Sequence, residues 1–205
     1  MIIAHHIIFG TNSHWLPNDE RGSGSECVRS EALQEFGPAT RTNSRVSVAN
    51  VPYNRERRQA MESVLKYPPV HLSDEQIQLV GNGFSQAIQD SGYIVYACAV
   101  MSTHVHIVVA RHEYEAVKIM KHFKTRATQH LKWVSAQTFS GTFSERTCSP
   151  PPRSPSPWQH RGWVVFINTE SHLWATINYV ERHYAPPQAW EFVRPIGGRP
   201  IEIGR

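Results

Sequence analysis

The alternation of apolar and polar positions divides the chain into short strands and amphipathic helices. Short apolar runs, rich in β-branched residues and bounded by Gly or polar clusters, predict strands over residues 2–9, 93–100, 104–110 and 162–167. Apolar residues that recur every three or four positions predict helices over 55–66, 73–92, 113–134 and 170–184. Ser73 and Gln76 form a capping-box pattern, which indicates a helix start.

This order of elements predicts an α+β fold. A βαββαβ succession is the ferredoxin-like split motif, an antiparallel sheet, here with an appended C-terminal helix. In that topology two helices cover one face of the sheet and leave the other face for a ligand or for the appended helix. We expect one domain over residues 1–205, with a polar insertion, a Pro-rich loop and a loose tail at about 10–69, 135–157 and 194–205.

Composition excludes several protein classes. Hydrophobic residues make up 40% of the chain and charged residues 19%, which is atypical of disordered or coiled-coil proteins. No apolar run approaches the roughly 20 residues that span a bilayer. Cys27, Cys98 and Cys148 are far apart and odd in number, so neither a disulfide framework nor a zinc ribbon is expected. The N-terminus lacks a signal-peptide pattern, and a reducing cytoplasm is the expected compartment.

Basic residues gather on the helix over 113–134. The whole chain has a formal net charge of +4, which permits a polyanionic partner without requiring one. The helix is expected to bury an apolar stripe of Val117, Met120, Ala127, Leu131 and Val134. The basic side chains of this helix either contact DNA phosphates or simply lie in solvent; they are Lys118, Lys121, Lys124, Arg126 and Lys132. Four tryptophans either stack on bases of a single strand or pack in the core; they are Trp133, Trp158, Trp163 and Trp174.

Two histidines in the third strand are candidates for metal ligands. Side chains alternate along a strand, so His104 and His106 point to one face while Val105 and Ile107 point to the other. The apolar row suits the helix-covered face, which places both imidazoles on the open face. Two such imidazoles can hold one divalent ion. The alternative is a pair of solvent-exposed histidines without a ligand.

The last predicted helix has an apolar stripe and a polar stripe side by side. The apolar stripe is Leu173, Ile177, Val180 and Tyr184, and the polar stripe is His172, Thr176, Tyr179 and His183. Tyr179 and His183 are four residues apart, so their side chains are neighbours. If the apolar stripe packs on the sheet, a phenol and an imidazole converge on the histidine pair. The alternative is an ordinary amphipathic helix with a half-exposed tyrosine.

In combination these features resemble the HUH single-tyrosine transposases, and most closely the REP-associated tyrosine transposases of bacterial chromosomes. The resemblance lies in MSTHVHIVV at 101–109, in the basic helix that follows and in YVERH at 179–183. It covers the core from about residue 71 to 184 well and the first strand less completely. Where that branch reads Tyr-(Ile/Val)-x-x-Asn-Pro, this chain has His183 and Tyr184 in place of Asn-Pro.

The resemblance implies a metal-dependent transposase, a DNA strand transferase. His104 and His106 correspond to metal ligands for Mg²⁺ or Mn²⁺, with His183 as a third ligand one helical turn after the tyrosine. Tyr179 corresponds to the nucleophile, which forms a 5′-phosphotyrosine intermediate. The implied partner is single-stranded DNA with hairpin or palindromic repeats, bound in the bacterial cytoplasm at the nucleoid and without a membrane. The oligomeric state, monomer or homodimer, stays open.

Two other functions also stay open at this point. The altered Asn-Pro position is compatible with a domesticated, non-catalytic nucleic-acid-binding protein of the same fold. A metal-dependent phosphoesterase that uses activated water would leave Tyr179 without a role. Replacement of Tyr179 by Phe separates the enzymes, since cleavage is lost only where the tyrosine is the nucleophile.

Overall fold

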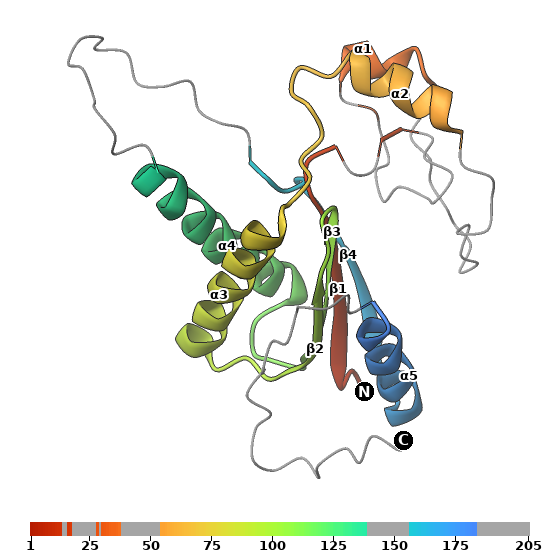
Figure 1. Cartoon of the computed structure of the whole chain (residues 1–205). Coiled ribbons are helices and arrows are strands. Elements are labelled where there is room, and N and C mark those ends of the chain that lie inside the picture. Colours follow the sequence, from red (N-terminus) through yellow and green to blue (C-terminus); the bar gives the residue numbers. More distant parts are fainter. Residues whose placement is uncertain (14–15, 18–27, 29, 38–53, 139–155, 184–205) are drawn as a thin grey trace.

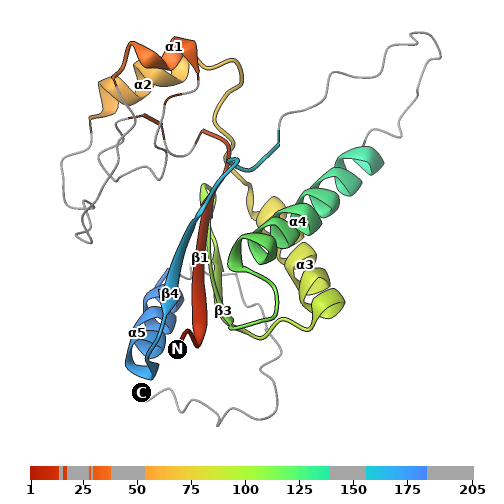
Figure 2. The same cartoon turned by 180° about the vertical axis from the view of Figure 1, so that it is seen from behind.

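A four-stranded antiparallel sheet forms the centre of the protein, with helices on both faces (Figures 1 and 2). The computed structural model describes residues 1–13, 16–17, 28, 30–37, 54–138 and 156–183. The strands are β1 (Ala4–Gly10), β2 (Val95–Val100), β3 (His104–Ala110) and β4 (Trp163–Ile167). Their order, β2-β3-β1-β4, is that of a ferredoxin-like sheet, and the predicted α+β class is confirmed.

Five helices occur in the described part of the chain. They are α1 (Glu31–Gln34), α2 (Arg55–Ser63), α3 (Asp74–Ser91), α4 (Ala116–Thr138) and α5 (Glu170–Glu181). The capping box at Ser73 is present, because Ser73 N donates to Gln76 Oε1 at 3.0 Å and Gln76 N donates to Ser73 Oγ at 3.3 Å. None of these helices is long and apolar enough to cross a membrane.

The predicted Pro-rich loop begins later than residue 135. Helix α4 continues to Thr138, because no Gly or Pro interrupts the sequence between 133 and 138. Residues 139–155 and the expected tail at 194–205 lie outside the described residues. The polar insertion at 10–69 contains the four-residue helix α1, which the periodicity did not indicate, and its side chains form a small separate cluster around Leu16, Leu33 and Met61.

Helices α3 and α4 cover one face of the sheet. Alternate strand residues such as Ile7, Phe9, Val105 and Ile107 point to this face and are fully buried against the two helices. The buried stripe predicted for α4 was partly wrong, since Val117 is 47% exposed. The buried positions of α4 are Ala116, Ile119, Met120, Phe123 and Ala127, a set spaced at three and four residues that includes two large side chains missing from the predicted stripe.

Gly83 lets α3 approach the backbone of α4. A Cβ at Gly83 would lie 2.7 Å from both the Cα and the N of Ala127. We therefore expect Gly83→Ala to destabilise the fold by about 1–3 kcal/mol, because the helices must separate. At an exposed helix position the same substitution would stabilise the helix by about 1 kcal/mol, since Ala has a higher helix propensity than Gly. Urea unfolding measures this, with the exposed Asn82→Ala as the control. Equal stability of the Gly83→Ala variant and the unchanged chain would show that the interface is loose.

Helix α5 covers part of the opposite face, as predicted for the appended helix (Figure 1). Ile177 and Val180 of α5 are buried against small and apolar sheet residues, namely Ala4, Ala97, Ala99, Val108 and Ile167. Thr169 caps the start of the helix, because its side chain accepts a hydrogen bond from His172 N. Tyr184, expected in this core, lies outside the described residues.

Candidate active site

His104 and His106 lie on the α5 face of the sheet, as their alternation with Val105 predicted. His106 is buried at 5% exposure, whereas His104 is half-buried. Their ring centroids are 5.1 Å apart. Val105 and Ile107 are buried in the core on the other face. Because β3 lies between β2 and β1, the histidine pair sits near the middle of the sheet.

Helix α5 and the turn that follows it bring Tyr179 and His183 to His106. The Tyr179 ring centroid lies 5.7 Å from that of His106 and 4.4 Å from that of His183. His183 in turn lies 5.4 Å from His106 by ring centroids. Tyr179 is 49% exposed, so a ligand from solvent can reach its phenol. The phenol and the imidazole of this segment therefore converge on His106, one member of the predicted pair.

Sequence reasoning missed a buried imidazole beside His106, that of His6. Its Nε2 lies 2.9 Å from Nδ1 of His106, and the two rings stack with centroids 5.1 Å apart. His6 is 6% exposed and meets the Tyr179 ring edge-on at 6.2 Å. The predicted topology contained the signal, because it places β1 beside β3 and so puts every second residue of β1 on the same face as His106.

The His6–His106 pair is neutral at physiological pH. Burial, with smaller contributions from the neighbouring His6, His104 and His183, lowers the pKa of His106 to about 2. Burial also lowers the pKa of His6 to about 4, with smaller contributions from His172 and His183. Two neutral imidazoles share one hydrogen in an N···N hydrogen bond. One of the two rings is therefore the donor and the other the acceptor.

The three predicted ligands suit a divalent ion by donor type. Each uses Nδ1 in a hydrogen bond: His104 with Thr103 Oγ1 at 3.0 Å, His106 with His6, and His183 with the carbonyl oxygen of Tyr179 at 2.7 Å. Ligating histidines commonly use one ring nitrogen this way and bind the metal through the other. Among the described residues, however, no group of three or more His, Cys, Asp or Glu side chains is arranged to hold an ion.

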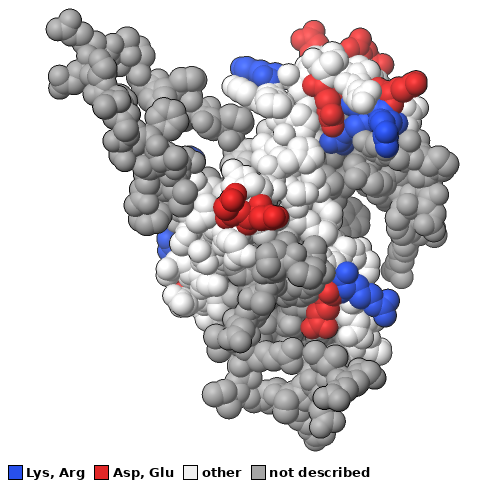
Figure 3. All heavy atoms as spheres, in the orientation of Figure 1, with Lys and Arg blue, Asp and Glu red and all other residues white. Residues whose placement is uncertain are grey.

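The basic residues of α4 lie across the sheet from Tyr179, since α4 and α5 cover opposite faces (Figures 1 and 2). Lys118 Nζ lies 3.4 Å from the Tyr114 ring centroid, and Arg126 pairs with Asp90 at 2.5 Å. Lys121 and Lys132 are exposed. On the face in Figure 3, described Lys and Arg side chains are interspersed with Asp and Glu. DNA contact by these residues stays a prediction.

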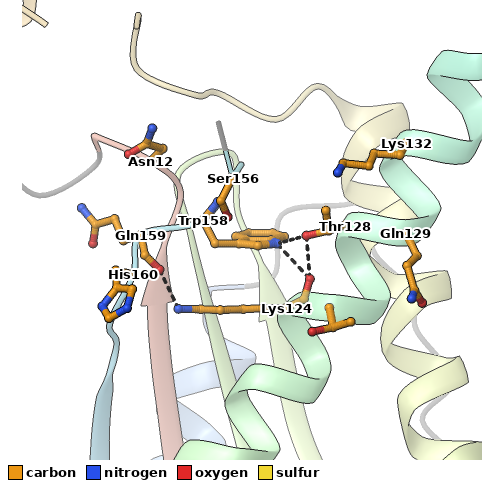
Figure 4. A pocket seen from close by; sticks show the side chains of 10 residues that line it. Asn12, Lys124, Thr128, Gln129, Lys132, Ser156, Trp158, Gln159 and His160 are labelled. Carbon is orange, nitrogen blue, oxygen red and sulfur yellow. Dashed lines mark hydrogen bonds between the residues drawn. The ribbon is translucent and has the colours of Figure 1, made fainter. Parts of the chain in front are cut away.

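Lys124 is hydrogen-bonded to the backbone of the segment before β4. Its Nζ donates to the carbonyl oxygens of Gln159 and Arg161, at 2.8 and 3.1 Å, and burial lowers its pKa to about 8. An open groove of about 660 Å³ lies here between α4 and residues 156–160, with Lys132 also on its wall (Figure 4). The ammonium of Lys124 thus ties the segment before β4 to α4.

Trp158 belongs to the core and not to a base-stacking surface. It is 4% exposed, and its ring meets Phe9 edge-on with centroids 5.3 Å apart. Its Nε1 donates to Thr128 Oγ1 at 3.0 Å (Figure 4). The stacking interpretation is therefore wrong for Trp158. Trp163 and Trp174 are 50% and 40% exposed, and the side chain of Trp133 is outside the described set.

Comparison with known proteins gives remote structural likenesses. No family model matches the chain, and no curated protein matches it. A REP-associated tyrosine transposase bound to a REP hairpin is similar over 87% of this chain and 64% of that one, with 10% identity and a TM-score of 0.41. This chain thus spans less than two thirds of that protein's length.

A protein from Deinococcus radiodurans R1, provisionally described as a transposase, is similar over 90% of this chain and 93% of that one. Its identity is also 10%, and its TM-score is 0.42.

Proposed function

We propose that this chain is a metal-dependent transposase, a DNA strand transferase that cleaves and rejoins single-stranded, hairpin-bearing DNA through a 5′-phosphotyrosine. The position of Tyr179 carries the proposal. Its half-exposed phenol stands beside three imidazoles, those of His6, His106 and His183, that reach it from two strands and from the turn after its own helix. A nucleophile must be open to substrate on one side and held on the other, and Tyr179 meets both conditions.

The reaction requires one bond to form and one to break. The Tyr179 Oη attacks the phosphorus of a phosphodiester, its proton is released to water, and an Oη–P bond forms. The P–O3′ bond breaks, and the leaving oxygen takes a proton to become a 3′-hydroxyl. The phosphate stays on the 5′ side, linked to Tyr179. Attack by a second 3′-hydroxyl reverses these steps and joins two strands, so no nucleotide triphosphate is consumed.

His104 and His106 would hold the divalent ion, with His183 as the third imidazole. An ion bound there would polarise the scissile phosphate and offset its developing negative charge. The protein's own contribution is orientation. The buried His6 ring fixes His106 through stacking and the N···N hydrogen bond, and the Tyr179 carbonyl fixes the ring of His183. These bonds keep the imidazoles from rotating away from the phenol.

Covalent capture of DNA tests the proposal. The full chain is incubated with a labelled single-stranded hairpin oligonucleotide and Mn²⁺ or Mg²⁺, and the mixture is resolved on a denaturing gel. We expect a protein–DNA adduct that is absent with a chelator, and peptide mass analysis should place the nucleotide on Tyr179. Cleavage without an adduct would favour activated water. Salt-sensitive binding without cleavage would favour the non-catalytic binder of the same fold.

A further inference from the structure

Trp163 lies on the same face of the sheet as the candidate active site. The register pairs Ile8 of β1 with His106 on one side and with Trp163, the first residue of β4, on the other. Directly paired residues of antiparallel strands point to the same face. Ile8, His106 and Trp163 therefore form one row across three strands, here called the Trp163 row.

Neighbouring side chains confirm which face the Trp163 row occupies. Ile167, four residues after Trp163 on the same strand, packs with α5, whereas Val164 packs in the core on the α3 and α4 face. Strands lie about 4.8 Å apart, so the Cα atoms of Trp163 and His106 are about 10 Å apart. An indole of this size, 50% exposed, thus lies at the rim of the Tyr179 site.

We propose that Trp163 is a stacking platform for an unpaired base of the DNA strand whose phosphate lies at Tyr179. This inference rests on the proposed function. An exposed tryptophan is by itself ordinary, and its place in the Trp163 row is what points to a ligand. Every base has a π-face that can stack on an indole, but the bases of a duplex cover those faces with one another. The platform therefore selects single-stranded DNA at the reacting phosphate.

The other exposed tryptophan of the described chain provides a matched control. Trp174 is 40% exposed on α5 and precedes Tyr179 by five residues. At about 100° per residue the two side chains are about 140° apart around the helix. Trp174 therefore faces away from the site that Tyr179 enters. Trp174 therefore matches Trp163 in side chain and in exposure, but it does not lie beside the candidate active site.

Binding is measured in the Tyr179→Phe background, so that no covalent step contributes. The probe is a fluorescent hairpin oligonucleotide with a single-stranded 5′ flank. We expect Trp163→Ala to weaken binding about 5- to 150-fold, in line with the stacking of one base. Trp163→Phe should restore most of the affinity, because it keeps an aromatic face. Trp174→Ala should change the affinity less than about twofold, and thermal melting checks that each variant is folded.

Abasic probes decide whether stacking is the cause. One base of the flank is removed at each position in turn, and at one position the loss caused by Trp163→Ala should disappear. A fully paired duplex should not distinguish the variant from its parent. The inference is overturned if the Trp163→Ala loss persists on every abasic probe, if Trp174→Ala has the same effect, or if no loss occurs. Failure of the proposed function has a separate signature, namely no covalent adduct with the unchanged chain.

Discussion

Tyr179→Phe is expected to abolish covalent capture of DNA and to lower strand cleavage by about 10³-fold or more. The substitution removes only Oη, the atom that would form the bond to phosphorus. The ring contacts with His6, His106 and His183 stay, since they involve the aromatic ring and not the hydroxyl. Folding and non-covalent DNA binding should therefore be unchanged.

Single-turnover cleavage with excess protein measures this effect, because it reports the chemical step without product release. The control is Tyr114→Phe, since Tyr114 packs against the other core, on the face covered by α3 and α4. Adduct formation should be unaltered in that variant. Cleavage that survives in Tyr179→Phe with no covalent intermediate would show that water, and not the phenol, attacks the phosphate.

Acidification below pH 6.5 is expected to destabilise the metal-free protein. An unfolded histidine takes up a proton near pH 6.5, whereas the pKa of folded His6 is lowered to about 4 and that of His106 to about 2. The unfolded state then binds more protons, so the free energy of unfolding falls as the pH decreases from 6.5. The loss from His6 alone is about 3 kcal/mol once the pH reaches 4, at 1.36 kcal/mol per unit. His106 adds to the loss in the same direction.

Urea unfolding at pH 7.5 and 4.5, in the presence of a chelator, measures this dependence. His6→Phe keeps an aromatic ring against His106 and removes the titrating nitrogen, so its stability should depend less on pH over this interval. The exposed His71 provides the control, because His71→Phe changes a side chain that is in water in both states. If His6→Phe loses as much stability in acid as the unchanged chain, the buried pair is not the source.

The sequence predicted the elements that position the site. Alternation along 104–110 placed His104 and His106 on one face, and the order of strands placed that face under the last helix. The four-residue spacing of Tyr179 and His183 placed both side chains together. The alternation and the four-residue spacing depend only on the periods of strands and helices, which local sequence determines, whereas the placement under the last helix depends on the order of elements.

Other features depend on contacts between distant parts of the chain. The His6–His106 hydrogen bond joins residues 100 positions apart, and its existence requires the register between β1 and β3. The exposure of Val117 depends on which way α4 is turned on the sheet, where the large side chains of Ile119 and Phe123 occupy the core. Burial of Trp158 likewise depends on its packing against Phe9, far away in the sequence.

The two halves of the candidate site belong to parts of the fold with different local stability. His6 and His106 are on β1 and β3, which are both hydrogen-bonded to strands on two sides. Tyr179 is in the last turn of α5, which ends two residues later at Glu181. Strand amides exchange with solvent only when the sheet opens, whereas a terminal helical turn opens by fraying. The candidate nucleophile Tyr179 is thus carried by a helical turn that opens by fraying, whereas His6 and His106 are carried by inner strands that open only with the sheet.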